Sequence, residues 1–301
     1  MTRTIGFVGL GHMGLPIAKR LLAGGHRVMA HDRRDEIREA ITAAGAAWAT
    51  SPREVADHCS VVMVSLPTPQ VVQEVALGQQ GLVHGAEMKL YLDLSTTGPQ
   101  VAQTVAAALR ERGVVAFDAP VSGGVAVAER GALAIMVSGP LERFAELEPL
   151  LKCFGNSVFH VGEQPGMGQL MKLINNLLST TTLAATYEIL SMGAKAGLDP
   201  KTMLDVLAVS SGTNHAVETK IPNFVMRDTP IGFSLDLSYK DVKLAVEAAD
   251  ALKAPMRMGR MTQEFWEEAM RRRGPKQDYL QVVKLFEDLA GVRWSPGTLS
   301  E

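Results

Sequence analysis

Residues 4–14 read Thr-Ile-Gly-Phe-Val-Gly-Leu-Gly-His-Met-Gly, an apolar strand pattern that runs directly into glycines 9, 11 and 14. Glycines at this spacing also occur in ordinary turns, so the motif alone is weak. Its context is stronger, because a helical pattern with Pro16 in its first turn follows, and Asp32 ends the next predicted strand. The unit therefore predicts a dinucleotide site whose loop residues are Gly9, Leu10, Gly11, His12, Met13 and Gly14.

Each glycine has a separate physical role in such a loop. The first permits the tight turn, the second lets the backbone approach a pyrophosphate, and the third allows close packing of helix on strand. Free N–H groups at the helix start would bind the phosphates. We expect Asp32 to accept hydrogen bonds from the adenosine ribose and to repel a 2′-phosphate, which favours NAD. Arg33 and Arg34 either accommodate that phosphate, which keeps NADP as an alternative, or are solvated loop residues.

Short apolar strands alternate with amphipathic helices over residues 1–163. This pattern predicts an α/β fold, a doubly wound parallel sheet built from crossover units. Gly24-Gly25 is expected to end the first helix, and Ser51-Pro52 and Gly98-Pro99 to start two others. The expected strands are Ile5–Val8, Arg27–His31, Val61–Ser65, Leu90–Leu94, Val114–Phe117, Ala132–Val137 and Val158–His160.

After Gly162 the pattern changes to helix alone, with Gln164–Gly168 as a plausible hinge. Residues 164–301 are therefore expected to form a second, all-helical domain. Its helices are predicted at Leu170–Ala196, Pro200–Ala208, Leu235–Ala251, Met258–Met270 and Asp278–Leu289. The most apolar stretch, residues 170–190, carries Lys172, two asparagines and Glu188, so it is expected to be a core helix and not a membrane span.

Composition narrows the partners. The 301 residues carry 30 basic and 32 acidic side chains, a net charge of −2 without long runs of one sign, which predicts no nucleic-acid or membrane partner. Cys59 and Cys153 lie in separate elements without further ligands at metal-like spacing, which favours reduced thiols and no metal. Because a strand begins at about Thr4, we expect no leader sequence and a cytoplasmic protein.

Lys172 lies on an otherwise apolar helix pattern, so its ammonium must be partnered or its pKa must fall by desolvation. Asn175 and Asn176, three and four residues further, share its face and are poor helix formers, which suggests a polar patch facing a cleft. The alternative is a lysine that extends to solvent beside two surface amides. As a functional group, Lys172 would exchange a proton with a substrate hydroxyl.

Ser122-Gly123-Gly124 follows the strand expected at Val114–Phe117, at the sheet edge where open α/β sheets bind ligands. Two glycines beside a hydroxyl expose backbone N–H groups that can bind a carboxylate, although a simple turn is the alternative. Ser122 lacks a Gly-x-Ser-x-Gly elbow, which argues against a nucleophile.

Five motifs together resemble the β-hydroxyacid dehydrogenase family over nearly the whole chain. They are Gly-Leu-Gly-x-Met-Gly-x-Pro, Asp93-x-Ser95-Thr96, Asp118-Ala119-Pro120-Val121-Ser122-Gly123-Gly124, Gly168-x-x-x-Lys172-x-x-Asn175-Asn176 and Lys240-Asp241. The resemblance implies a Rossmann-type domain, a helical domain that binds substrate and assembles into a homodimer or homotetramer, and metal-free hydride transfer. It also implies that Lys172 is the general acid and base, that Thr96 lies beside the nicotinamide, and that Lys240 and Asp241 close over the cofactor. Leu66-Pro67 would line the same cofactor.

The sequence thus predicts an oxidoreductase that interconverts a small 3-hydroxy acid and its semialdehyde, with the substrate carboxylate bound by Ser122, Gly123 and Gly124. Substrates of the 3-hydroxyisobutyrate, tartronate semialdehyde, 2-(hydroxymethyl)glutarate and succinic semialdehyde types stay open, as does a non-catalytic, cofactor-binding scaffold. Residues 210–215, Phe233 and Leu235 are expected to face the substrate. Asn214 and His215 either recognise a second polar group or cap a helix.

Overall fold

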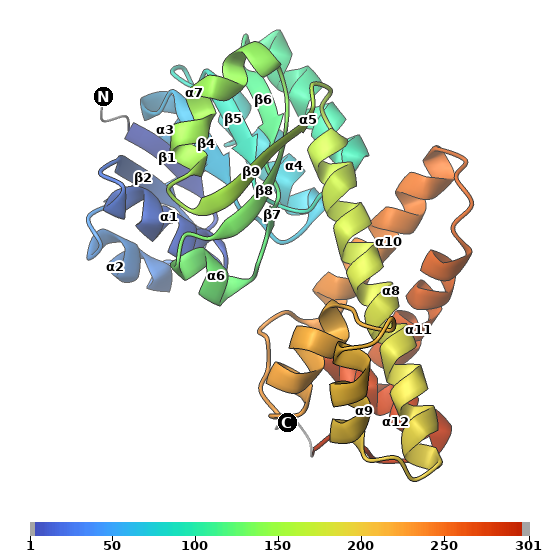
Figure 1. Ribbon diagram of the computed structural model, residues 1–301. Helices are drawn as coiled ribbons and strands as arrows, with labels where there is room; N and C mark the ends of the chain where they lie inside the picture. Colours follow the sequence, from blue (N-terminus) through green and yellow to red (C-terminus); the bar gives the residue numbers. More distant parts are fainter. Residues whose placement is uncertain (1–3, 297–301) are drawn as a thin grey trace. The chain divides into compact units, whose positions relative to one another are not determined.

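The computed structural model describes residues 4–296 of the chain (Figure 1). The chain divides into two compact units, Met1–Lys172 and Leu173–Glu301, here called unit 1 and unit 2. The long helix α8 (Met167–Lys195) runs from the first into the second. A functional domain boundary at 163/164 stays a prediction.

Unit 1 is built on a nine-stranded sheet with the order β3-β2-β1-β4-β5-β6-β8-β7, and β9 pairs with β8. All pairs from β3 to β6 are parallel, as the alternation of strands and helices predicts. The strands are β1 (Thr4–Val8), β2 (Arg27–His31), β3 (Ala47–Trp48), β4 (Val61–Val64), β5 (Leu90–Asp93), β6 (Val115–Asp118), β7 (Val121–Ser122), β8 (Leu133–Ser138) and β9 (Gly155–Gly162).

The far end of the sheet departs from the fully parallel arrangement. Strands β6 and β7 both run antiparallel to β8, with Asp118 opposite Ser138 and Ser122 opposite Ala134. Only Ala119 and Pro120 separate β6 from β7, and a parallel pair needs a crossover of a dozen or more residues. The two short strands therefore follow one line along β8, interrupted where Pro120 has no N–H to donate.

Helices cover both faces of this sheet, so strand residues are buried on both sides. Ile5 and Phe7 pack in one core with α1 (Gly14–Ala23), whereas Val62 and Val64 pack in another with α3 (Pro52–His58). Such double burial explains the continuous apolar strands of the sequence. The other helices of unit 1 are α2 (Glu36–Thr42), α4 (Pro69–Leu77), α5 (Pro99–Glu111), α6 (Val125–Glu129) and α7 (Leu141–Leu151), with a 3₁₀ turn at Leu82–His84.

Unit 2 is helical throughout its described part. Its core gathers large side chains such as Tyr187 and Trp266, both fully buried. The expected helices are present, although the last begins later than expected because Asp278 caps a separate 3₁₀ turn. Besides α8 they are α9 (Pro200–Ala208), α10 (Leu235–Ala251), α11 (Arg257–Arg273), the 3₁₀ turn Tyr279–Gln281 and α12 (Val282–Ala290).

Apart from the 3₁₀ turn at Leu82–His84, sequence periodicity missed β3, β7 and the π-helix Ala216–Val225. The two strands have only two residues each, too few to show an alternation. The third element is a π-helix with Pro222 inside it, so its side chains do not follow the 3.6-residue period. No helix among residues 4–296 has the length and apolarity needed to cross a membrane.

Candidate active site

The glycine loop after β1 shows which glycines the protein itself requires. Gly9 has φ +94°, and a Cβ there would lie 2.3 Å from the carbonyl oxygen of Ser65. A Cβ on Gly14 would lie 1.9 Å from the carbonyl oxygen of Gly9. A Cβ on Gly11, however, would meet no atom within 4 Å. Packing explains the first and third glycines but not the second, which fits a backbone that a pyrophosphate approaches closely.

The start of α1 suits a bound anion. Its N-cap position is Met13, whose side chain makes no capping hydrogen bond, and the first turn carries no acidic residue. The first N–H groups of a helix have no partner within the helix, and the helix dipole favours negative charge there. The loop and helix start therefore fit the phosphates of a dinucleotide.

Asp32 links the end of β2 to this loop. One carboxylate oxygen accepts a hydrogen bond from the Leu10 amide at 2.7 Å, and the other accepts from the Arg34 amide at 3.0 Å. The Arg34 guanidinium also contacts both oxygens, at 3.0 and 3.1 Å. Burial alone would raise the pKa of Asp32, but these hydrogen bonds outweigh it and lower that pKa, so the carboxylate is ionised. Arg33, the predicted cofactor residue, is exposed, and it is Arg34 that reaches Asp32.

The other predicted cofactor and substrate residues of unit 1 follow the carboxyl ends of neighbouring strands. Leu66 and Pro67 follow β4, and Thr96 follows β5. The Leu66 amide donates to the Ser95 hydroxyl at 2.9 Å, which ties these two loops together. Because β1, β4, β5 and β6 are consecutive in the sheet, all these residues lie at one edge, where open α/β sheets bind ligands.

Ser122 follows β6 beyond this edge, as expected, and it lies on a short strand of its own, β7. The strand β7 extends past the end of β6 along β8, so the residue pairs with Ala134. Gly123 has φ +144°, and Gly124 has φ +81° and precedes α6 as its N-cap. Both glycines are exposed and adopt backbone conformations that other residues rarely take.

Lys172 lies in the second turn of α8 and is 9% exposed. The expectation of a buried lysine on this helix is therefore confirmed, whereas its apolar neighbours Met171 and Ile174 are exposed. The start of α8 lies at the same sheet edge, because the amides of Gly166 and Gln169 donate to Asp118 at the end of β6, at 2.6 and 3.5 Å. Unit 1 thus brings Lys172 to the edge that carries the predicted cofactor loops.

The four polar site residues predicted in unit 2 are linked by hydrogen bonds and an ion pair. Asn175 donates to the Asn176 side chain at 3.0 Å, and Asn176 donates to Asp241 at 2.7 Å. Asp241 is buried, and its second oxygen lies 3.0 Å from the Lys240 ammonium. The four residues that the motifs singled out are therefore in contact with one another. Phe233 is half-buried and packs edge-on against the Tyr279 ring, with 5.7 Å between the ring centroids.

Asn214 caps the start of the π-helix Ala216–Val225. Its side-chain oxygen accepts hydrogen bonds from the amides of Ala216 and Val217, at 2.9 and 3.2 Å, at the start of the π-helix. His215 is the N-cap residue of that helix but makes no capping hydrogen bond. Burial and the nearby Lys220 lower the pKa of His215.

Sequence reasoning missed a buried polar cluster at the same sheet edge, formed by Asp93, Asp118, Ser138 and Gln169. Asp118 appeared only as part of a motif, and Ser138 and Gln169 gave no local signal. Burial, together with the nearby Asp93 carboxylate, raises the pKa of Asp118 to about 6 in spite of hydrogen bonds from Ser138 and two amides. The described residues contain no group of His, Cys, Asp and Glu that could hold a metal ion.

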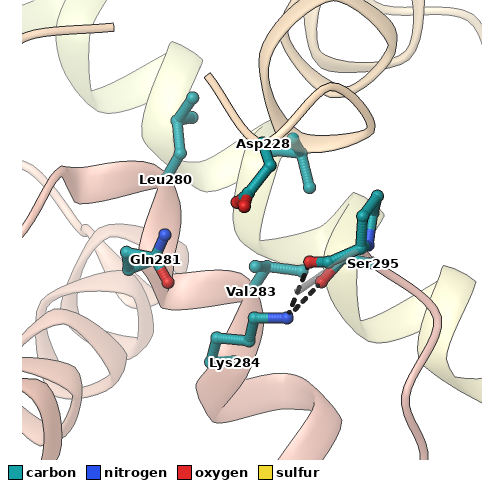
Figure 2. Close-up of a pocket in the computed structure, with 8 residues that line it drawn as sticks. Asp228, Leu280, Gln281, Val283, Lys284 and Ser295 are labelled. Carbon is teal, nitrogen blue, oxygen red and sulfur yellow. Dashed lines mark hydrogen bonds between the residues drawn. The ribbon is translucent and has the colours of Figure 1, made fainter. Parts of the chain in front are cut away.

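A small cavity in unit 2 lies apart from these residues. Figure 2 shows Asp228, Gln281 and Lys284 around it, with Lys284 hydrogen-bonded to Ser295. Its volume is about 10 Å³, enough for one water molecule at most, and none of the predicted site residues lines it.

Comparison with known proteins identifies the family. Residues 4–162 match the NAD binding domain of 6-phosphogluconate dehydrogenase, and residues 166–286 match the NAD-binding domain of NADP-dependent 3-hydroxyisobutyrate dehydrogenase. The chain belongs to the 3-hydroxyisobutyrate (β-hydroxyacid) dehydrogenase family. It is accordingly an NAD(P)-dependent 3-hydroxyacid dehydrogenase that acts on a CH–OH group.

Similar proteins cover nearly the full length of the chain. The 2-(hydroxymethyl)glutarate dehydrogenase of Eubacterium barkeri is 35% identical over 97% of this chain and 98% of its own. The NAD-dependent L-serine dehydrogenase of Pseudomonas aeruginosa is 36% identical over 96% and 99%. A solved structure of the Mycobacterium tuberculosis 3-hydroxyisobutyrate dehydrogenase with L-serine superposes with a TM-score of 0.87 at 30% identity, covering 95% of this chain and 99% of that one.

The glycine loop yields a paired prediction. In Gly14→Ala the new Cβ collides with the Gly9 carbonyl, so we expect the free energy of unfolding to fall by about 1–3 kcal/mol, although alanine is normally the better helix former. In Gly11→Ala the stability should stay within about 0.5 kcal/mol of the parent. Its Kd for NADH should rise at least about tenfold, because the methyl group projects where the pyrophosphate approaches.

Urea unfolding and fluorescence titration with NADH measure both effects. Unchanged NADH binding by Gly11→Ala would contradict the assignment of this loop to the pyrophosphate.

Proposed function

We propose that the chain interconverts a small 3-hydroxy acid of the 3-hydroxyisobutyrate or tartronate semialdehyde type and its semialdehyde, with Lys172 as general acid and base. The observation that carries this proposal is the burial of Lys172 in the second turn of α8, whose start is hydrogen-bonded to the sheet edge that holds the cofactor loops. NAD(P), when bound, supplies or accepts the hydride.

Lys172 handles the proton of the reaction. In the direction of oxidation it accepts the proton of the substrate hydroxyl, and in the reverse direction it returns that proton to the oxygen of the aldehyde. Ser122, Gly123 and Gly124 bind the substrate carboxylate through a hydroxyl and the backbone N–H groups of two exposed glycines. Asn175 and Asn176 orient the substrate, and Phe233 contributes to its apolar boundary.

Dehydrogenase activities are named for relatives that are 32–38% identical to this chain, and they agree with an enzyme and not with a non-catalytic, cofactor-binding scaffold. A substrate of the 2-(hydroxymethyl)glutarate type is a second candidate, since a dehydrogenase of that name is 35% identical to this chain. Steady-state rates with a panel of 3-hydroxy acids, including these two types and L-serine, measure the specificity directly.

The substitution Lys172→Met keeps the approximate length of the side chain but removes the amine. We expect kcat to fall by about 10²–10⁴-fold, the usual contribution of general acid–base catalysis, while NADH affinity and thermal stability are retained. Lys201→Met is the matched control, because the Lys201 side chain is 76% exposed on α9 and should leave turnover unchanged. Turnover of Lys172→Met within a few-fold of the parent would remove the lysine from the mechanism.

For the cofactor we propose a preference for NAD. The ionised Asp32 is held against the loop by the Leu10 amide, where it can accept from ribose hydroxyls and would repel a 2′-phosphate. We expect a higher kcat/KM with NADH than with NADPH, and Asp32→Ala should narrow this ratio. Asp35→Ala is the control, because that carboxylate is exposed and only three residues away. A higher efficiency with NADPH would overturn the proposal.

We also propose that the chain assembles into a homodimer or homotetramer through unit 2. This unit exposes many large apolar side chains within its described part, including Leu178, Ile189, Met192, Val206, Val209, Leu252 and Met261. Such residues, when contiguous, mark protein interfaces. Light scattering should show at least a dimer at micromolar concentration, and Leu178→Lys should weaken it, whereas Leu141→Lys in unit 1 should not. A monomeric parent protein would refute this assembly.

A further inference from the structure

The beginning of α8 is held by side chains that lie far from it in sequence. One carboxylate oxygen of Asp118, at the end of β6, accepts the amides of Gly166 at 2.6 Å and Gln169 at 3.5 Å. The Ser138 hydroxyl donates to that same oxygen at 2.8 Å and accepts the Gly168 amide at 2.8 Å. Three backbone N–H groups at and just before the helix start, which the helix cannot satisfy itself, therefore find their partners on two strands.

The helix approaches these strands as closely as its backbone allows. A Cβ on Gly168 would lie 2.6 Å from the carbonyl oxygen of Met136 and 3.0 Å from the Cβ of Asp118. Any larger residue at position 168 would push the helix start away from the carboxylate. The glycine is thus part of the attachment.

Gln169 joins the same helix start to the loop that carries Thr96. This side chain is fully buried, and its oxygen accepts the Thr97 amide at 2.9 Å and the Gly98 amide at 3.4 Å. Its nitrogen donates to the Ser95 carbonyl at 3.0 Å. Asp93 holds the loop from the other side, since it accepts the Ser95 amide at 2.8 Å and the Thr97 hydroxyl at 3.3 Å. The loop and the helix start therefore share one hydrogen-bonded network.

Lys172 follows Gln169 by three residues and Gly168 by four, so it lies on the same face one helical turn further on. The rise of an α-helix puts its Cα only about 4.5 Å along the axis from that of Gln169. Over so short a distance a shift of the first turn is passed to the lysine almost undiminished. The hydrogen bonds that hold the start of α8 against Asp118 and Ser138 therefore also fix the position of Lys172.

We propose that Asp118, acting with Ser138 on the start of α8, is a positioning residue that holds Lys172 in register with the cofactor loops. The proposal rests on the proposed role of Lys172 in the reaction. An ordinary helix cap would lie on the residue just before the helix, whereas this one lies on the sheet, at the edge where the reaction takes place. The direct hydrogen bond at 2.6 Å and the relay through Ser138 give it two points of attachment.

The electrostatics suit a positioning role better than a purely structural one. Asp118 stands opposite Asp93 in the register of β5 and β6, and burial and this second carboxylate both disfavour its charged form. A buried carboxylate is often replaceable by an apolar residue without loss of stability. Burial favours the protonated form of Asp118. We infer that a carboxylate is present at this position because it orients the start of α8.

The test compares two substitutions of Asp118. Asp118→Leu keeps the shape of the side chain but removes the acceptor for Gly166, Gln169 and Ser138, whereas Asp118→Asn keeps one acceptor oxygen. Glu287→Met is the matched control, since Glu287 is a fully buried carboxylate in unit 2 that accepts the amides of Trp294 and Ser295 at 2.8 and 2.6 Å. It should lose thermal stability without affecting Lys172.

Two readouts are taken on each full-length variant with NAD bound, the oxidised cofactor that accepts the hydride of a 3-hydroxy acid. In steady-state kinetics we expect Asp118→Leu to lose about 100-fold in kcat with KM changed less than about threefold, since misplacing a catalytic group by about 1 Å has effects of this size. Asp118→Asn should recover most of the loss. Acetylation of Lys172 relative to the exposed Lys201, measured by peptide mass spectrometry, should rise about tenfold in Asp118→Leu, because a loosened helix start exposes the lysine.

The acetylation readout needs no substrate, which separates this proposal from the proposed function. If the parent enzyme turns over none of the 3-hydroxy acids, the function fails, and the labelling ratio alone decides whether Asp118 positions Lys172. An unchanged ratio in Asp118→Leu, or an equal change in Glu287→Met, would overturn the positioning role. If Asp118→Leu does not fold, Ser138→Ala, which removes the acceptor of the Gly168 amide, is judged by the same two readouts and the same criteria.

Discussion

The organisation of unit 1 depends on how the first N–H groups of α8 are satisfied inside a buried sheet edge. A helix start that is removed from water must find acceptors, or each orphaned amide costs about 1–3 kcal/mol. Here the acceptors are the carboxylate of Asp118 and the hydroxyl of Ser138. Because β6 runs parallel to β1, β4 and β5, Asp118 lies at the edge that carries the glycine loop and the Thr96 loop, and Ser138 lies there because it pairs with Asp118 across the antiparallel strands β6 and β8. The same hydrogen bonds consequently satisfy the first amides of α8 and fix where Lys172 lies.

This arrangement is achieved at the expense of stability at neutral pH. The pKa of Asp118 in the folded protein is about 6, above its ordinary value of 3.8, so the folded state binds this proton more tightly than the unfolded chain. The contribution of Asp118 to stability therefore falls as the pH rises from about 4 through about 6. Above that range the whole cost is present. Asp32 behaves in the opposite way, since hydrogen bonds from Arg34 and Leu10 favour its charged form.

Features encoded in neighbouring residues could be predicted from the sequence. Strand β2 and helices α9 and α10 have the predicted bounds, because their periodicity and flanking caps are complete within one segment. The glycine loop could also be predicted, because its residues are close in sequence. A Cβ on Gly14 would collide with the Gly9 carbonyl, so packing requires a glycine at this spacing. The antiparallel end of the sheet was missed because Pro120 interrupts what is one line of pairing along β8. The π-helix was missed because its period is not 3.6.

The network around Lys172 could not be predicted for a different reason. Asp118 contacts Ser138 and Gly166 across 20 and 48 residues, and Gln169 contacts Thr97 across 72. Periodicity relates residues within about 11–18 positions, so it is silent on such pairs. The sequence nevertheless carries a trace of the network, since Asp93 and Asp118 are two acidic residues at the ends of apolar strands, where local rules disfavour them. A charged residue that breaks the local pattern at a ligand-binding edge is set by tertiary contacts and function and not by local propensity. Here the partners are the Ser95 amide for Asp93, and the Ser138 hydroxyl and Gly166 amide for Asp118.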